Sequence, residues 1–246
     1  MRVVRELENW YEAVSLRLRL GRRELSVLSF RNGISIVVRR RSRDWDVVRD
    51  LFLQSGYERS FQYLRTISKD ATVLDLGANI GCFSILAAAQ NERLQIRAYE
   101  PGPPNVRMFE LNCLANPALA RRVHLHAEAV GGTDRVAEWH FDEDNPGGSS
   151  LYGQGSGATV HVRSLAEIVS GLGGSLAFVK IDIEGAEYEL VRATPAAVWE
   201  QIPALSIEVH RDPEQRQSKS DLLQRFRELG FTAEVDGRFA VFLHRQ

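Results

Sequence analysis

The sequence predicts an α/β fold built on a mostly parallel, seven-stranded sheet with helices on both faces. Three observations support this class: strands and helices alternate from residue 71 onward, a glycine-spaced turn joins the first of these strands to its helix, and the chain ends in a hairpin. Alternation of this kind is typical of parallel sheets, because each parallel connection needs a crossover helix. We therefore expect a Rossmann-like sheet with a C-terminal antiparallel hairpin, preceded by an N-terminal helix and a β-hairpin.

Residues 1–49 are expected to form an extension, and residues 50–246 the main domain. Within the extension, apolar residues recur at helical spacing, which predicts one amphipathic helix over residues 5–20 that covers an apolar surface. The residues at this spacing are Leu7, Trp10, Tyr11, Val14 and Leu18.

A β-hairpin and a basic cluster follow in the extension. Leu25 to Phe30 and Ile34 to Val38 have strand-like patterns on either side of Asn32-Gly33, a pair that tolerates the positive φ of a tight turn. The cluster is then interpreted either as a solvated loop or as a grip for a phosphate or carboxylate on a substrate. It consists of Arg39, Arg40, Arg41 and Arg43.

Two helices are predicted between the cluster and the sheet. Asp44 is expected to cap the first, which ends near Gly56. The second runs from about Glu58 to Ile67.

The sheet itself is predicted in two stretches separated by a β-rich excursion. The first stretch comprises strand 72–76, helix 80–90, strand 94–99, helix 104–115 and strand 123–127. The excursion has strands near 134–141 and 158–163, which flank a glycine-rich segment, 145–157, interpreted as a mobile surface connection or as a flap over the substrate. The second stretch comprises strand 176–183, a helix from Ala186, strand 204–209, a helix at about 220–229, and strands 231–235 and 238–244 joined at Asp236-Gly237.

Composition narrows the class of protein. A chain of 246 residues with 44% hydrophobic and 26% charged residues is typical of a soluble globular protein. Its formal charge of -1 gives no overall field that would attract nucleic acid or an anionic membrane. Cys82 and Cys113 lack metal-ligand spacing and are expected to be core thiols in a reducing compartment. With no apolar run near the roughly 18 residues of a membrane span, we expect a cytoplasmic protein without a nucleic-acid partner.

The turn after the first sheet strand is the sequence feature that indicates most about function. Its two glycines lack Cβ atoms, so the backbone can turn sharply and approach a ligand beside the N-terminal amides of the next helix. The spacing is G-x-x-x-G, however, and Ala78-Asn79 fill the place where a dinucleotide pyrophosphate would pass. We expect a nucleotide-type cofactor without a pyrophosphate, bound by Asp75, Gly77, Ala78, Asn79 and Gly81.

The next two strand ends are also expected at the cofactor. Glu100, followed by Pro101, ends the second strand nineteen residues after Gly81, where an acid accepts hydrogen bonds from ribose hydroxyls. Glu128 follows the third strand and is interpreted as an acceptor for the exocyclic amine of adenine or as an exposed loop residue. The small Ala129 would leave room for the base.

Carboxylates and a histidine follow the last two parallel strands. Asp182 and Glu184 share side-chain parity, so both carboxylates can face one crevice. Glu208 and His210 share a face at the end of the neighbouring strand. We expect His210 to be a general base, oriented by Asp182 or Glu184, because a histidine near neutral pKa suits removal of a hydroxyl proton. The alternative is a histidine that only closes the strand.

The same side chains raise a metal hypothesis. Asp182, Glu208 and His210 could bind Mg²⁺ next to a substrate oxygen. Metal-free proton abstraction needs the same groups, so no metal is expected. The following acids, Glu187 and Glu189, are interpreted as favourable charge at a helix N-terminus.

Taken together, these motifs resemble the FkbM family of S-adenosylmethionine-dependent methyltransferases over about residues 50 to 245. The resemblance is carried by 56–58, 73–84, 98–101, Asn112, 128–131, 149–151, 179–187 and 208–210. It implies a class I methyltransferase fold, S-adenosylmethionine as methyl donor, and O-methylation of a small-molecule or glycan acceptor such as a sugar, glycolipid or secondary metabolite. By the same resemblance, Tyr57 helps to close over the cofactor and Asp182 contributes to its binding.

Two other functions stay open. A nicotinamide-dependent oxidoreductase or sugar epimerase would share the sheet and the ribose acid, but the sequence has no third glycine in phase and no Tyr-x-x-x-Lys pair. A non-catalytic cofactor-binding module would keep the fold without turnover, and the acids at four strand ends argue against it.

Overall fold

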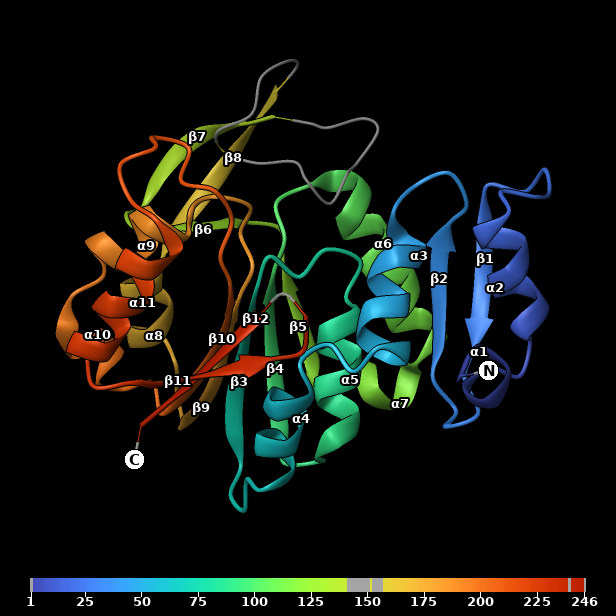
Figure 1. Cartoon of the computed structure of the whole chain (residues 1–246), viewed down its shortest axis with the longest axis horizontal. Helices are drawn as coiled ribbons and strands as arrows, with labels where there is room; N and C mark the ends of the chain where they lie inside the picture. The colour runs from blue at the N-terminus through green and yellow to red at the C-terminus, as the bar shows by residue number, and fades with distance from the viewer. Residues whose placement is uncertain (1, 141–150, 152–156, 239, 246) are drawn as a thin grey trace.

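The computed structural model describes residues 2–140, 151, 157–238 and 240–245, and its centre is a seven-stranded sheet in the order β11-β12-β10-β9-β3-β4-β5 (Figure 1). The parallel strands are β3 (Ala71–Leu76), β4 (Leu94–Tyr99), β5 (Val123–His126), β9 (Leu176–Ile181) and β10 (Ala204–Glu208). The antiparallel hairpin of β11 (Thr232–Asp236) and β12 (Ala240–His244) completes the sheet, with β12 next to β10. The predicted fold class is therefore confirmed.

Helices cover both faces of this sheet (Figure 1). Each face has its own hydrophobic cluster. On one face lie α4 (Glu58–Arg65), α5 (Cys82–Gln90), α6 (Pro103–Ala115) and α7 (Pro117–Ala120). On the other lie α8 (Leu165–Ser170), α9 (Glu187–Ala193), α10 (Ala196–Trp199) and α11 (Lys219–Glu228). Adjacent residues of β3 divide between the clusters: Val73 belongs to the cluster that contains Phe83, whereas Leu74 belongs to the cluster that contains Trp199. The short helices α7, α8 and α10 were not predicted.

The predicted single helix over residues 5–20 is wrong. The segment forms α1 (Arg2–Glu6) and α2 (Trp10–Arg17), separated by Leu7, which bridges to Phe30. Between them, the Asn9 side chain bonds the outer edge of β1 (Leu25–Ser29): its Nδ2 donates to Val27 O at 2.8 Å, and its Oδ1 accepts from Ser29 N at 2.9 Å. These strand bonds hold residues 7–9 out of a continuous helix.

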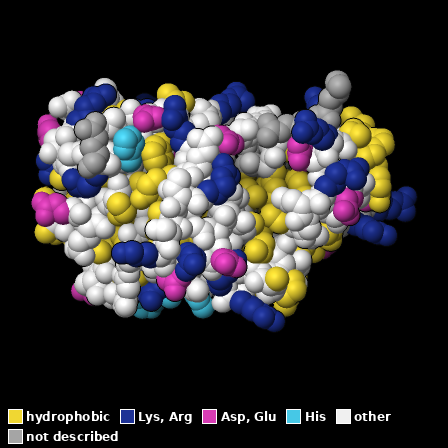
Figure 2. All heavy atoms as spheres, turned by 90° about the horizontal axis from the view of Figure 1, so that it is seen from below, with side chains coloured by type: hydrophobic (Ala, Val, Ile, Leu, Met, Phe, Trp, Pro, Cys, Tyr) yellow, Lys and Arg dark blue, Asp and Glu magenta, His cyan; other side chains and the backbone are white. Residues whose placement is uncertain are grey.

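The apolar face predicted for this segment is correct at Leu7, which is fully buried, and wrong at the other four residues. Ala13 and Leu16 are the buried residues of α2, while Trp10, Tyr11, Val14 and Leu18 are each at least 42% exposed. Figure 2 shows hydrophobic side chains gathered at the end of the molecule where α1 and α2 lie, with basic side chains around them.

The hairpin of the extension packs directly on the main domain. Its second strand, β2 (Ser35–Arg39), is held by Asn112 of α6, whose Oδ1 accepts from Val37 N at 2.6 Å. Leu28 of β1 belongs to the same hydrophobic cluster as Phe83 of α5. The predicted boundary at residue 50 falls inside a continuous helical segment, so the extension and the domain share one core.

That helical segment consists of α3 (Asp44–Val48) and a π-helical turn, η1 (Arg49–Leu53). The prediction that Asp44 caps it is wrong, because Arg43 precedes the helix and makes no side-chain cap. The buried Asp44 carboxylate instead accepts from Arg39 N at 2.8 Å, Nε at 2.9 Å and Nη2 at 2.7 Å. A bidentate guanidinium is a stronger partner than the helix amides.

The β-rich excursion forms a separate three-stranded sheet in the order β6-β8-β7. Its strands are β6 (Ala129–Gly131), β7 (Arg135–His140) and β8 (Gly157–Ser164), and β6 was not predicted. The glycine-rich segment 145–157 lies outside the described residues apart from Leu151 and Gly157. Across the described ranges, the helices lack the combination of length and apolar character that a membrane crossing requires.

Candidate active site

Two cavities open at the carboxyl edge of the main sheet, and they share a wall. The wide cavity, of about 260 Å³, is bordered by Tyr57 and Glu208, and the narrow cavity by Glu100. Asn79, Asp182 and Glu184 border both. The sequence-predicted residues of the first, second, fourth and fifth parallel strands thus converge on one region.

The turn between β3 and α5 needs both of its glycines. Gly77 has a φ of +79°, and a Cβ atom there would overlap the backbone carbonyl of Asp182. Gly81 has a φ of +86°, and a Cβ atom there would lie 2.8 Å from the ring of Phe109. This close packing brings the Gly77 backbone to the wall of the narrow cavity.

Glu100 joins the β3 turn to the loop after β4. Its Oε2 accepts from Asn79 N at 2.9 Å, while its Oε1 accepts from Gly102 N at 2.9 Å and from Asn105 Nδ2 at 3.2 Å. Burial raises the pKa of this carboxyl, and the three donors oppose that rise. Three bonds leave room for one more on a carboxylate with about four acceptor positions.

A second unfilled acceptor borders both cavities. The side-chain Oδ1 of Asn79 is buried and has no hydrogen-bond partner among the described residues. A buried polar atom without a partner is rare in native proteins and points to a bound group that completes it.

Asp75, predicted at the cofactor, is instead fully buried under the turn and borders neither cavity. Its Oδ2 accepts from Ser84 Oγ at 2.6 Å, and its Oδ1 lies 3.4 Å from Lys180 Nζ. The parallel register of β3 and β9 sets these two residues opposite each other.

Lys180 is a functional residue that sequence reasoning missed. Its buried ammonium donates to Gly77 O at 2.7 Å and lies 3.2 Å from Asp182 Oδ2. Burial lowers the pKa of Lys180, but Asp182 and Asp75 outweigh this and keep the pKa above its ordinary value. A permanent positive charge therefore fixes the turn to the end of β9.

His210 is held by an acid that was not assigned to the site. Its Nδ1 lies 2.8 Å from Oε1 of Glu187, which is fully buried at the start of α9. Glu187 also accepts from the backbone amides of Ile183 at 3.1 Å and Gly185 at 2.9 Å. Beyond its charge at a helix N-terminus, Glu187 thus orients the imidazole. Glu189 points elsewhere and pairs with Arg135.

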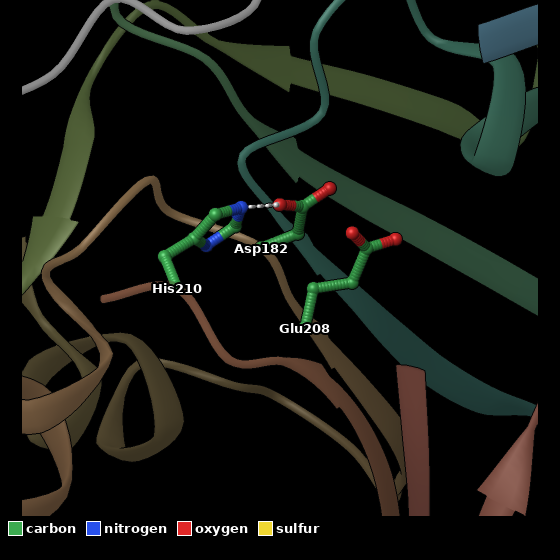
Figure 3. A group of neighbouring side chains, drawn as sticks. All are labelled: Asp182, Glu208 and His210. Carbon is green, nitrogen blue, oxygen red and sulfur yellow. Dashed lines mark ion pairs between the residues drawn. The ribbon is translucent and has the colours of Figure 1, made fainter. Parts of the chain in front are cut away.

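The other ring nitrogen of His210 faces carboxylates. Nε2 lies 3.8 Å from Asp182 Oδ1 and 3.4 Å from Glu184 Oε2, and Figure 3 shows the ring directed at Asp182 with Glu208 alongside. Burial lowers the pKa of His210, but Glu187, Asp182 and Glu184 raise it further, to about 10. At neutral pH the ring is therefore an imidazolium, which differs from the near-neutral base expected from the sequence.

Two carboxylates of the site titrate near neutrality instead. Burial and the charge of Asp182 raise the pKa of Glu184 to about 7 and that of Glu208 to about 7. Tyr57 donates its hydroxyl to Glu208 Oε1 at 2.7 Å, which partly opposes the rise for Glu208.

Tyr57 borders the wide cavity, and its ring lies 5.3 Å from that of Phe83. Its backbone is left-handed, with a φ of +61°. Asn79 and Glu184, which also border the wide cavity, have φ values of +52° and +51°. Three non-glycine residues around one cavity thus adopt a conformation that L-residues rarely take.

Asp182, Glu208 and His210 could also hold a cation, because one ligand atom from each lies within 4.8 Å of the others. Lys180 already places a positive charge 3.2 Å from Asp182 Oδ2. The expectation that no metal is needed stays a prediction.

The remaining residues predicted at the cofactor divide between cavity and surface. Pro101 and Ala129 border the narrow cavity, whereas the Glu128 carboxylate points to Arg163, with its Oε2 3.9 Å from Nε.

The arginine cluster divides in the same way. Arg39 is bound to Asp44 and Arg40 to Glu12, and of the four arginines only Arg43 borders the described wall of the wide cavity.

Comparisons with known proteins agree with this geometry. The sequence profile of the methyltransferase FkbM domain matches residues 75–233. The antimetabolite synthetase AmbE of Pseudomonas aeruginosa is 25% identical over 201 residues, which cover 67% of this chain but 9% of AmbE. Methyltransferase 1 of Beauveria bassiana is 21% identical over 184 residues, which cover 65% of this chain and 71% of that protein.

Solved structures share the fold. The crystal structure of methyltransferase FkbM from Methylobacillus flagellatus has a TM-score of 0.51 and 16% identity, with 72% of this chain and 44% of that chain covered. A SAM-dependent methyltransferase from Agrobacterium tumefaciens also has a TM-score of 0.51, with 11% identity over 92% of this chain and 71% of that chain. The chain therefore spans less than half of the M. flagellatus protein and about a tenth of AmbE.

Proposed function

The chain belongs to the FkbM family of S-adenosylmethionine-dependent methyltransferase domains, and from this premise we propose that it methylates a hydroxyl group of a sugar, glycolipid or secondary metabolite. One observation carries the proposal: the narrow cavity beside Glu100 and the wide cavity beside Tyr57 meet at Asp182 and Glu184. Two substrates bound in the two cavities would face each other at these carboxylates.

The narrow cavity has the groups that S-adenosylmethionine requires. Glu100 keeps one acceptor position for a ribose hydroxyl, and Asn79 Oδ1 is an acceptor that lacks a partner. Asp182 and Glu184 supply negative charge at the junction, which favours a cation there. When bound, S-adenosylmethionine supplies a methyl group on a positively charged sulfur that leaves readily.

The chain's own residues then have two tasks, alignment and proton removal. Holding two reactants in line can lower a barrier by ~7 to 11 kcal/mol. As the C–S bond breaks and the new C–O bond forms, the hydroxyl proton must pass to the protein. We assign it to Glu184, which can accept a proton near neutral pH and whose Oε2 lies 3.4 Å from the imidazolium of His210 that Glu187 holds in place.

The charge of the residues around the wide cavity favours a neutral methyl acceptor. Among the residues that the structure describes, six acidic ones border it: Asp46, Asp50, Asp182, Glu184, Glu208 and Asp236. In the same described set, three basic residues border it: Arg43, Lys180 and Arg238. This surplus of carboxylates disfavours the anionic methyl acceptor that the arginine cluster suggested. A sugar fits better, because its hydroxyls can donate to carboxylates and the C–H face of its ring can pack on Phe83.

Family membership favours methyl transfer over the oxidoreductase or epimerase alternative. The exclusion of nucleic acid and of a metal, and the cytoplasmic location, stay predictions. A non-catalytic binding module would bind the cofactor without turnover in an activity assay.

The test is to incubate the purified chain with methyl-labelled S-adenosylmethionine and a panel of sugars, polyols, hydroxylated polyketides, amines and RNA, with and without EDTA. We expect S-adenosylhomocysteine and the labelled methyl ether of a neutral hydroxyl compound, with no effect of EDTA. Transfer to RNA or to amines alone, or binding without turnover on every acceptor, would contradict the proposal.

Two variants refine this test. Glu184→Gln and His210→Gln should each lower turnover by about 100-fold or more, because the first removes the proposed proton acceptor and the second removes the imidazolium beside it, while affinity for S-adenosylhomocysteine stays within about threefold. Glu92→Gln, at an exposed position that borders neither cavity, is the matched control and should behave like the wild type.

A further inference from the structure

Trp139 of β7 has a buried indole N–H without a hydrogen-bond partner among the described residues. The residue is 7% exposed and packs with Ala129, Val160 and Val162 in the core of the small three-stranded sheet. An indole N–H usually finds an acceptor when it is buried. Its lack of one suggests that the acceptor belongs to a ligand.

The surroundings of the indole identify which ligand this would be. Trp139 borders the narrow cavity together with Glu100, Pro101 and Ala129. A Cβ atom at Gly102 would lie 3.7 Å from Trp139 Nε1 and 2.8 Å from Glu100 Oε1, so the indole nitrogen lies beside the loop that presents the ribose acid.

The same cavity contains a complementary group. Asn79 Oδ1 is a buried acceptor without a partner, and Trp139 Nε1 is a buried donor without a partner. A donor and an acceptor left open around one cavity require a ligand that offers both kinds of group. An adenosyl group does so, through its ring nitrogens, exocyclic amine and ribose hydroxyls.

We propose that Trp139 is a cofactor-recognition residue that donates its indole N–H to the adenosyl portion of S-adenosylmethionine. This inference rests on the proposed function and adds to it a binding residue from outside the seven-stranded sheet. The small sheet of β6, β8 and β7, which Figure 1 shows above the main sheet, thereby becomes a wall of the cofactor site.

The chain supplies its own control. Trp199 is also buried with an unpartnered indole N–H, but it packs edge-on against Phe226 and borders neither cavity. Burial and an open N–H are therefore common to both tryptophans, and only the position of Trp139 predicts a response to ligand.

The test uses the indole N–H signals of the ¹⁵N-labelled full chain. With four tryptophans in the sequence, the Trp139 signal can be assigned in the wild type by elimination, from Trp10→Phe, Trp45→Phe and Trp199→Phe, even if Trp139→Phe does not fold. S-adenosylhomocysteine and adenosine should both shift the Trp139 signal, methionine should not, and the Trp199 signal should stay in place.

Calorimetry gives the second readout. Trp139→Phe keeps an aromatic ring but removes the donor, so it should weaken binding of S-adenosylhomocysteine by about three- to tenfold, while Trp199→Phe binds like the wild type. If the wild type binds S-adenosylhomocysteine and the Trp139 signal does not move, this inference alone fails. If the wild type binds neither S-adenosylhomocysteine nor S-adenosylmethionine, the proposed function fails with it.

Discussion

Glu187→Gln should lower the pKa of His210 by more than one unit. In the folded protein this pKa rises from 6.5 to about 10, and the hydrogen bond and charge of Glu187 are the two largest causes of the rise. At 1.36 kcal/mol per pKa unit this rise corresponds to about 5 kcal/mol, and solvent screening of a side chain that is 30% exposed reduces it to roughly 2 to 3 kcal/mol. Without the Glu187 charge, only Asp182 and Glu184 oppose desolvation, and we expect a pKa of roughly 7 to 8.

The assay is an NMR titration of the histidine side chains. The chain has six histidines, and His210→Gln identifies the signal of interest. His126, whose pKa is lowered by burial, lies at the end of β5 and should titrate identically in the wild type and in Glu187→Gln. Urea unfolding checks that the variant is folded, because Glu187 also accepts from two backbone amides.

Two results would refute the reasoning. A wild-type His210 that titrates near 6.5 would show that the dyad with Glu187 does not hold the proton. A His210 pKa unchanged by Glu187→Gln would show that the remaining carboxylates, rather than Glu187, set it.

Three further predictions follow from the site. Glu184 and Glu208 have folded-state pKa values raised from 4.5 to about 7. Their contribution to stability is therefore present below pH 4.5 and is lost as the pH rises through about 7. Urea unfolding should show about 2 kcal/mol less stability at pH 8 than at pH 5. Tyr57→Phe removes the hydrogen bond that lowers the Glu208 pKa, so an NMR titration of the glutamate carboxyl groups should show this pKa above its wild-type value of about 7; an unmoved Glu208 titration would argue against this coupling. Gly77→Ala should unfold the protein or lower its melting temperature by more than 10 °C, which corresponds to roughly 2 kcal/mol or more of stability. Gly173→Ala is the control and should be nearly neutral, because a Cβ atom there would meet nothing within 4 Å. Similar melting curves for the two variants would contradict the steric reasoning.

The sheet was predictable because its signals are local. Short apolar strands, intervening helices and turn residues fix a parallel order, and the carboxyl ends of parallel strands necessarily meet at one edge. This is why the sequence alone predicts that Glu100, Asp182 and Glu208 lie near one another. The role of each side chain at that edge depends on its neighbours, which the pattern does not show.

Lys180 and Asp75 illustrate the difference. Asp75 was expected to face the cofactor, but the register with β9 sets it opposite Lys180 inside the sheet. A lysine within an otherwise apolar strand was a usable signal, since a buried ammonium requires carboxylate partners. That requirement points from Lys180 to Asp75 and Asp182.

Glu187 carried a weaker signal. The turn before it contains Gly185 at a φ of +101°, whose amide needs an acceptor that no strand or helix supplies. Only the folded turn brings that acceptor under His210, so a first-turn acid looked like ordinary helix charge.

The prediction for the N-terminal segment was wrong for an energetic reason. Hydrophobic spacing favoured Trp10 and Tyr11 as the packed face, yet the helix approaches the hairpin with the smaller Ala13 and with Leu16. The hydrogen bonds of Asn9 to β1 fix the helix start and therefore its rotation. Side-chain to backbone bonds of this kind override helical periodicity.

The left-handed backbone at Glu184 sets stability against the proposed activity in this protein. A non-glycine residue in this conformation costs on the order of 1 to 3 kcal/mol, which glycine would largely recover at 184, whereas Asn79 already belongs to a type that enters this conformation readily. A screen for heat-resistant variants should therefore select glycine at 184, and the survivors should be robust proteins that have lost a carboxylate from the junction of the two cavities. At 57, the buried phenol and its packing on Phe83 outweigh the backbone cost, so tyrosine should be retained. Thermostabilisation of this protein is best directed to other positions.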